Sequence, residues 1–99
     1  METTIFDNDD TAYLAWAQAN PLGFVLNRYR VGTSTSYLVL HRATCNAVTK
    51  PRQSEPGEFT QRGYIKVCST DLEELRTYAR SVGRIDGSFS KVCKLCGVG

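Results

Sequence analysis

Hydrophobic positions recur at helical spacing in two segments of this chain. The first segment follows Asp9 and Asp10, either of which can cap a helix, and Pro21 stops it. Its apolar stripe consists of Tyr13, Leu14, Trp16 and Ala17. We therefore predict a short amino-terminal helix that lies on a sheet.

The second helical segment spans about residues 70 to 82. Thr70 and Glu73 stand three positions apart, as the two members of a capping box do, and Gly83 follows the segment in the place of a left-handed helix cap. The apolar positions of one helical face are Leu72, Leu75, Tyr78, Ala79 and Val82. This pattern predicts an amphipathic helix.

Three further segments, at about 23 to 31, 36 to 41 and 63 to 68, are rich in residues that favour strands. The sequence GTSTS between the first two predicts a turn and thus an antiparallel hairpin. Residues 46 to 62 are polar and contain two prolines, which predicts a long exposed loop. The expected fold class is α+β, with a three-stranded antiparallel sheet, two helices and a carboxyl-terminal structural zinc knot.

Length and composition limit the class of protein. Ninety-nine residues, 41% of them hydrophobic, predict a single domain over residues 1 to 99, and the longest apolar runs are too short to span a membrane. The first ten residues have no basic and apolar pattern of a secretory signal, so we expect a cytoplasmic protein with reduced thiols. Four of the ten acidic residues fall in these first ten residues, which we expect to be an acidic, flexible start. The rest of the chain therefore has six acidic residues and twelve Lys and Arg.

The candidate chemistry lies in two short motifs, HRATC and CKLC. They pair His41 with Cys45 and Cys93 with Cys96 at the spacings of metal ligands, and three thiolates with one imidazole complete a tetrahedral Zn²⁺ shell. A redox pair and unrelated thiols are the alternatives. Cys68, at the end of a predicted strand, is a rival for the place of His41, but a small buried thiol needs no metal to explain it.

The order of these elements resembles the Ada-like zinc-binding domains, the family of the metal-binding module of the Ada DNA-repair protein. The likeness covers about residues 36 to 97: a strand ending in HRATC, a loop, a strand ending in KVC, a helix and CKLC. It implies that His41, Cys45, Cys93 and Cys96 are the ligands and that Cys68 takes an apolar strand position. In Ada the first ligand is a cysteine that accepts a methyl group, and His41 cannot do so.

The expected function is that of a non-catalytic, zinc-binding module that binds nucleic acid, DNA rather than RNA. Cations that can contact phosphates, interleaved with tyrosines, are Arg28, Arg30, Arg42, Arg52, Arg62 and Lys66. The alternative is a protein-interaction or accessory domain in which zinc has only a structural role. An enzyme is disfavoured because the single histidine is committed to the metal and a full shell activates no water; no small-molecule substrate is evident.

Overall fold

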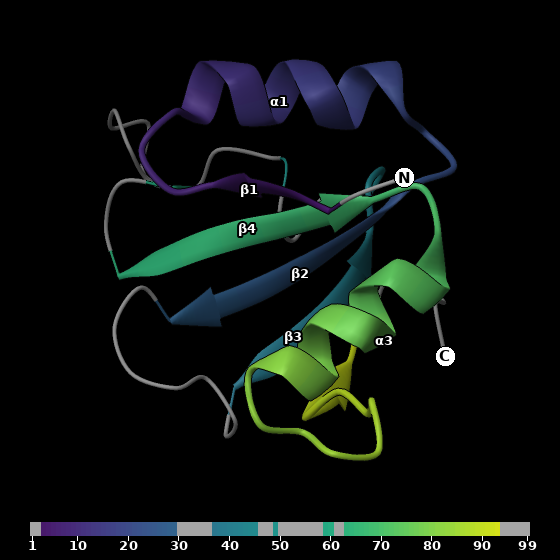
Figure 1. Cartoon of the computed structure of the whole chain (residues 1–99). Coiled ribbons are helices and arrows are strands. Elements are labelled where there is room, and N and C mark those ends of the chain that lie inside the picture. The colour runs from purple at the N-terminus through teal and green to yellow at the C-terminus, as the bar shows by residue number, and fades with distance from the viewer. Residues whose placement is uncertain (1–2, 30–36, 46–48, 50–58, 61–62, 94–99) are drawn as a thin grey trace.

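A computed structural model describes residues 3–29, 37–45, 49, 59–60 and 63–93 of the chain. These residues form a mixed sheet and two helices (Figure 1). The strands are β1 (Thr4–Phe6), β2 (Phe24–Tyr29), β3 (Leu38–Arg42), β4 (Tyr64–Ser69) and β5 (Lys91–Val92), and the helices are α1 (Asp10–Ala19) and α3 (Leu72–Ser81). The strand order is β1-β4-β2-β3-β5. No helix in the described part of the chain combines the length and the apolar character that a membrane crossing requires.

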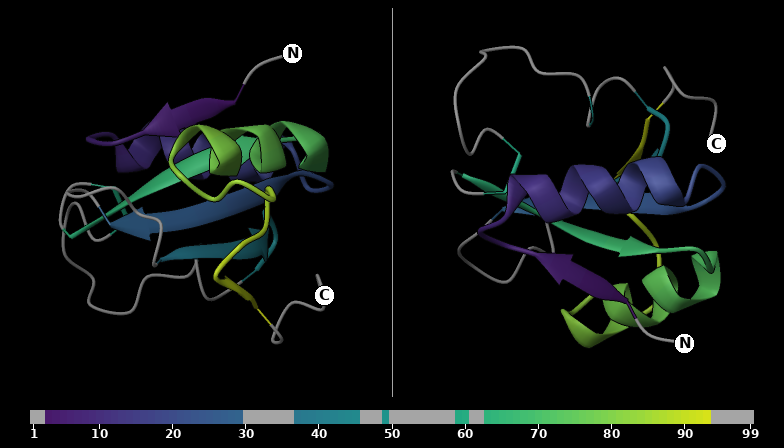
Figure 2. Two further views of the ribbon diagram at one scale, coloured as in Figure 1. Left: turned by 60° about the horizontal axis from the view of Figure 1, so that its bottom comes forward. Right: turned by 90° about the horizontal axis from the view of Figure 1, so that it is seen from above.

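The helices cover opposite faces of the sheet. Neighbouring residues of one strand show this directly: Val25 belongs to the buried cluster that includes Tyr13 of α1, whereas Leu26 belongs to the cluster that includes Leu75 of α3. The left view of Figure 2 looks onto the α3 side, with α1 behind the strands. Because both faces are covered, adjacent residues of a central strand, such as Val25 and Leu26, are both buried.

The prediction of three antiparallel strands is wrong, because the sheet has five strands and is mixed. The three predicted strands are present as β2, β3 and β4, and β2 pairs antiparallel with both of the others. β1, which lies within the acidic start, pairs antiparallel with β4. β5 pairs parallel with β3. These two strands span three and two residues, too few for a period-two pattern to appear in the sequence.

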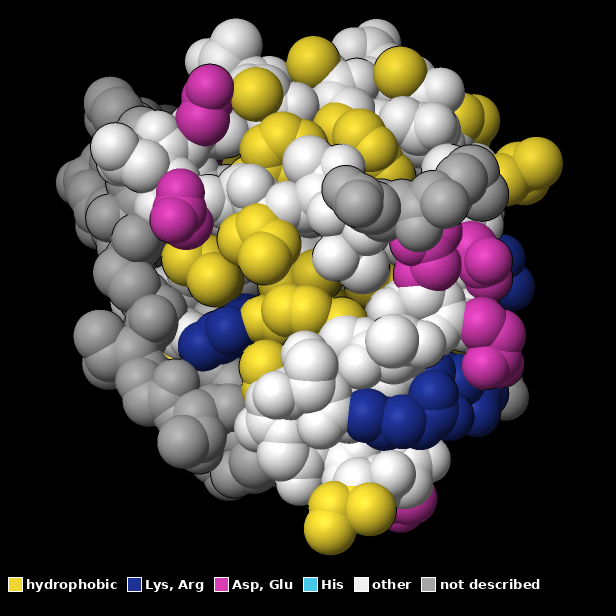
Figure 3. All heavy atoms as spheres, in the orientation of Figure 1, with side chains coloured by type: hydrophobic (Ala, Val, Ile, Leu, Met, Phe, Trp, Pro, Cys, Tyr) yellow, Lys and Arg dark blue, Asp and Glu magenta, His cyan; other side chains and the backbone are white. Residues whose placement is uncertain are grey.

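β1 forms one edge of the sheet and carries apolar side chains. Ile5 is 49% exposed, and Phe6 contacts the edge of the Tyr13 ring at a centroid distance of 5.9 Å. On the face shown in Figure 3, hydrophobic side chains gather between α1 and α3, where β1 crosses the view. Part of the predicted flexible start is therefore a strand of the sheet.

α1 begins at an aspartate cap, as predicted. Asp9 is the N-cap, and its Oδ1 accepts a hydrogen bond of 2.9 Å from the backbone N–H of Ala12. After the helix the chain passes close under it, because a Cβ atom on Gly23 would lie 2.8 Å from the Trp16 ring. This close approach explains the glycine at the start of β2.

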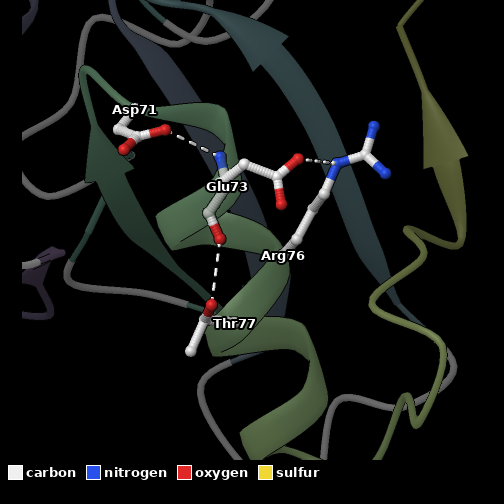
Figure 4. A network of polar contacts seen from close by, with 4 residues as sticks. All are labelled: Asp71, Glu73, Arg76 and Thr77. Atoms are coloured by element: carbon white, nitrogen blue, oxygen red, sulfur yellow. Dashed lines mark hydrogen bonds and ion pairs between the residues drawn. The ribbon is translucent and has the colours of Figure 1, made fainter.

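α3 begins one residue later than the predicted capping box requires. The N-cap is Asp71 instead of Thr70, and its carboxylate accepts a hydrogen bond from the Glu73 N–H (Figure 4). The Glu73 carboxylate lies 3.4 Å from the Arg76 Nε and does not return to the cap (Figure 4). The predicted left-handed residue after the helix is confirmed, since Gly83 has a φ of 115°.

The predicted loop 46–62 is described only at Thr49, Phe59 and Thr60. Phe59 is 7% exposed and packs against Tyr13 with ring centroids 5.8 Å apart, and Thr60 is fully buried. The expectation of an exposed loop is thus wrong at this end, which packs under α1.

Candidate metal centre

Three of the four predicted ligands meet at one end of the sheet. His41 lies on β3, and a backbone hydrogen bond of 3.0 Å from the Cys45 N–H to the Arg42 carbonyl forms the turn that brings Cys45 back. Cys93 directly follows β5, and its N–H donates to the Leu40 carbonyl at 2.9 Å. The parallel pairing of β5 with β3 is therefore what carries Cys93 to His41.

The ligand atoms have the spacing of a metal site. One ligand atom each from His41, Cys45 and Cys93 lies within 4.8 Å of the others, and the two Sγ atoms are 3.9 Å apart. Two thiolates that bind one tetrahedral Zn²⁺ at about 2.3 Å each stand roughly 3.8 Å apart. The two sulfurs already have this separation in the structure.

The imidazole of His41 is prepared to act as a ligand. It is 7% exposed, and its Nδ1 is buried without a hydrogen-bond partner among the described residues. Burial, with the charges of Lys66 and Lys91, lowers the pKa of His41 to about 4, so the ring is neutral at pH 7. A buried nitrogen that lacks a partner is costly, and a bound cation would satisfy it.

Cys68, the rival ligand, lies outside this group. His41 and Cys68 each pair with Val25, from β3 and β4 on its two sides, so a whole strand separates them. The thiol is fully buried in the apolar cluster under α1, and burial raises its pKa. Cys96, the predicted fourth ligand, lies outside the described residues.

Three of the predicted nucleic-acid residues, Arg28, Arg42 and Lys66, lie in the described part of the chain, and they do not share one face. Arg30, Arg52 and Arg62 lie outside the described residues. Arg28 and Lys66 belong to opposite faces, because Lys66 pairs with Asn27, the neighbour of Arg28. Arg28 donates to the Tyr78 hydroxyl of α3 through Nη1. Of the described cations in the set, Arg42 lies at an exposed position.

Lys66 is a buried cation that the sequence analysis placed at the surface. It is 4% exposed, and its Nζ donates to Asn27 Oδ1 at 2.8 Å and to the Phe59 carbonyl at 2.7 Å. Burial lowers the pKa of Lys66 to about 8, although the charges of Cys68 and Asp10 act in the opposite direction. Lys66 thus holds the segment 59–60 against the sheet.

Asp10 completes this attachment, and its role was not predicted. Its carboxylate accepts hydrogen bonds from the N–H groups of Phe59 and Thr60, at 3.1 and 2.8 Å, and from the Thr60 hydroxyl. Burial raises the pKa of Asp10, but these hydrogen bonds and the charge of Lys66 outweigh it, so the pKa lies below its usual value. The sequence gives no signal of this contact beyond two adjacent aspartates, of which only one can be the cap.

An open groove lies between α1 and the turn that leads to Cys45. It is lined by Leu14, Ala17, Gln18, Pro21, Ala43, Thr44 and Thr49. Among the described lining residues, no side chain is of the kinds that usually act as a general acid or base.

Comparison of the chain with models of protein families, with curated proteins and with solved structures finds no match. The resemblance to the Ada-like domains therefore stays a prediction that depends on the order and spacing of the motifs. The possible metal site depends instead on the geometry of His41, Cys45 and Cys93.

Proposed function

We propose that this chain is a non-catalytic module held together by one structural Zn²⁺ ion, with His41, Cys45, Cys93 and Cys96 as ligands. The observation that carries the proposal is the convergence of two buried thiols, 3.9 Å apart, on the buried imidazole of His41, whose Nδ1 has no hydrogen-bond partner among the described residues. The ion would tie the end of β5 to the end of β3. Its role is to fix the carboxyl-terminal part of the fold.

The donor set favours zinc over other metals. Thiolates and imidazole suit Zn²⁺, whereas Ca²⁺ and Mg²⁺ prefer oxygen ligands. Three thiolates and a divalent ion leave the site with about one negative charge, and the nearby cations Lys66 and Lys91 would offset it.

The same donor set argues against catalysis at the metal. Four protein ligands leave no coordination position for water or substrate, which is the mark of a structural site. The chain has one histidine, and the proposal commits it to the ion. No second His is therefore present to act as a general base.

Metal analysis of the purified protein tests this proposal. We expect about one equivalent of zinc per chain, retained in Cys68→Ala and lost or strongly weakened in Cys45→Ser, Cys93→Ser and Cys96→Ser. The Cys68→Ala variant is the matched control, because it removes a buried thiol of the same apolar cluster. Loss of zinc from Cys68→Ala with retention in His41→Ala would replace the proposed set by four cysteines, and no zinc in the wild type would refute the proposal.

Nucleic-acid binding by the six predicted cations stays a prediction beside this proposal. It requires that binding weaken steeply with salt and that it be lost in the double variant Arg28→Ala, Arg30→Ala. The alternative, a protein-interaction domain, predicts partners that co-purify and resist nuclease treatment.

A further inference from the structure

Three tyrosines form a cluster at the end of the sheet that lies away from the metal centre. Tyr29 ends β2, Tyr64 begins β4 and pairs with Tyr29, and Tyr37 directly precedes β3. The ring centroids are 4.6 Å apart for Tyr29 and Tyr37, 5.4 Å for Tyr29 and Tyr64 and 5.5 Å for Tyr37 and Tyr64. We call these residues the tyrosine cluster.

The rings of the tyrosine cluster are inclined to one another by only 25° to 42°, and two of them reach solvent. Tyr29 is 41% exposed and Tyr64 is 36% exposed. An aromatic cage for an alkylammonium group places its ring faces around a central point, whereas these rings contact one another. The arrangement is therefore a stacking surface and not a cage.

A cation lies close to this surface, on the same face of the sheet. Lys66 Nζ lies 5.9 Å from the centroid of the Tyr64 ring. The side chain is held there by Asn27 and the Phe59 carbonyl. Its charge interacts with the Asp10 carboxylate, and the buried side chain is not available for direct contact with a ligand.

The distribution of acidic residues points to an anionic partner. The sequence has no Asp or Glu from residue 11 to residue 54 or from residue 59 to residue 70, so β2, β3 and β4 carry cations only. The acidic side chains of α3 stand at its beginning, beyond the other end of β4 (Figures 1 and 3). Asp9 and Asp10, at the beginning of α1, accept hydrogen bonds from backbone N–H groups, which stabilise these carboxylates.

We propose that the tyrosine cluster is a binding surface for single-stranded nucleic acid, whose bases stack on the exposed rings of Tyr29 and Tyr64. Unpaired bases present their faces to aromatic side chains, whereas the bases of a duplex are already stacked. Arg30 follows Tyr29 and Arg62 precedes Tyr64 by two positions in the sequence, so cations accompany both rings along the chain. The cluster thus joins the two elements of such sites, aromatic rings and positive charge.

This proposal is independent of the metal. His41 lies four residues along β3 from Tyr37, about 13 Å at the rise of a strand. A failure of metal binding and a failure of base stacking would therefore be observed in different measurements on the same protein.

Fluorescence anisotropy with labelled 12-nucleotide DNA and RNA of mixed sequence, and with a DNA duplex of the same sequence, tests the proposal on the metal-loaded full chain. We expect the single strands to bind more tightly than the duplex. Tyr29→Ala and Tyr64→Ala should each weaken binding by about fivefold or more, since one stacked base contributes about 1–3 kcal/mol. Tyr29→Phe and Tyr64→Phe, which keep the ring, should bind within about twofold of the wild type, as should the control Leu22→Ala at an 86% exposed site.

Ring-proton resonances give a second measurement that needs no substitution. On addition of the single strand, the resonances of Tyr29 and Tyr64 should shift upfield, as stacking on a base requires, whereas those of the buried Tyr13 should not. Equal affinity of the alanine variants and the wild type would overturn the proposal, as would tighter binding of the duplex or no binding at low salt. DNA and RNA arms decide which single strand is preferred.

Discussion

Replacement of Lys66 by methionine tests whether this side chain is a buried structural cation. Methionine has a similar length and removes the charge and the three N–H donors. The change relieves the desolvation of the ammonium group, but it leaves Asn27 Oδ1 and the Phe59 carbonyl without the bonds that Nζ donates. Each lost partner costs about 1–3 kcal/mol, so the two effects oppose each other near neutral pH.

The pH dependence separates these effects. Burial lowers the pKa of Lys66 from 10.5 to about 8, so between these values the unfolded chain binds more protons than the folded chain. The contribution of Lys66 to stability therefore rises with pH in this window, and it is smallest below pH 8. A difference of 2.5 in pKa corresponds to about 3 kcal/mol in total, of which roughly 2 kcal/mol falls between about pH 7 and pH 9.5.

Urea unfolding of the wild type and Lys66→Met at several pH values measures this contribution. Burial also raises the pKa of Tyr13 and Cys68, and both groups lower stability at high pH in both proteins, so the difference between the two proteins is the informative quantity. We expect the free energy of unfolding of the wild type to rise relative to Lys66→Met by roughly 2 kcal/mol over that range. A difference that does not change with pH would refute the buried, desolvated state of Lys66, and a loss of nucleic-acid binding without any change in stability would favour a surface role.

Three further changes test other contacts. Asp10→Asn should lower the free energy of unfolding by about 1–2 kcal/mol at neutral pH, because one amide oxygen replaces two carboxylate oxygens that bind residues 59 and 60. The loss should diminish in acid, as the pH falls through the lowered pKa of the wild-type carboxylate. Gly23→Ala should cost about 1–3 kcal/mol in urea unfolding, because its Cβ would lie 2.8 Å from the Trp16 ring, and the smaller Trp16→Leu should restore part of the loss. Removal of the metal with a chelator should abolish hydrogen-exchange protection of the Cys93 N–H on Leu40 while protection in the β2–β4 pairing persists; equal loss in both places would show that the ion supports the whole fold.

The spacing of hydrophobic residues predicted the elements in which an apolar pattern repeats over a continuous stretch of sequence. Both helices and β2, β3 and β4 lie close to their expected ranges, because their apolar patterns extend over five or more residues. The helix cap shows the limit of this reasoning. Ser69, Thr70 and Asp71 can all cap a helix, and only the path of the chain out of β4 selects Asp71.

The metal ligands were predictable where their separation in the sequence determines how close their side chains can lie. The pairing of His41 with Cys45 through one turn is local, and the structure confirms their approach to Cys93. Lys66 was assigned to the surface although the alternation of YIKVCS places it on the same face as Cys68, which was expected to be buried. Consistent use of that alternation would have predicted a buried lysine with partners on the neighbouring strand and loop.

β5 was missed because its two residues are too few to show a strand pattern, and the proposed metal ion would add to its stability. Backbone hydrogen bonds from Ser90 and Cys93 to Leu38 and Leu40 hold this strand, each contributing about 1 kcal/mol. Fixing the backbone of each residue in the segment costs about 1–2 kcal/mol, so these bonds alone do not offset the ordering of the chain that follows Gly87. Structural zinc sites supply about 10 kcal/mol, enough to order the segment, and for this reason the parallel strand and the proposed metal site should form and disappear together.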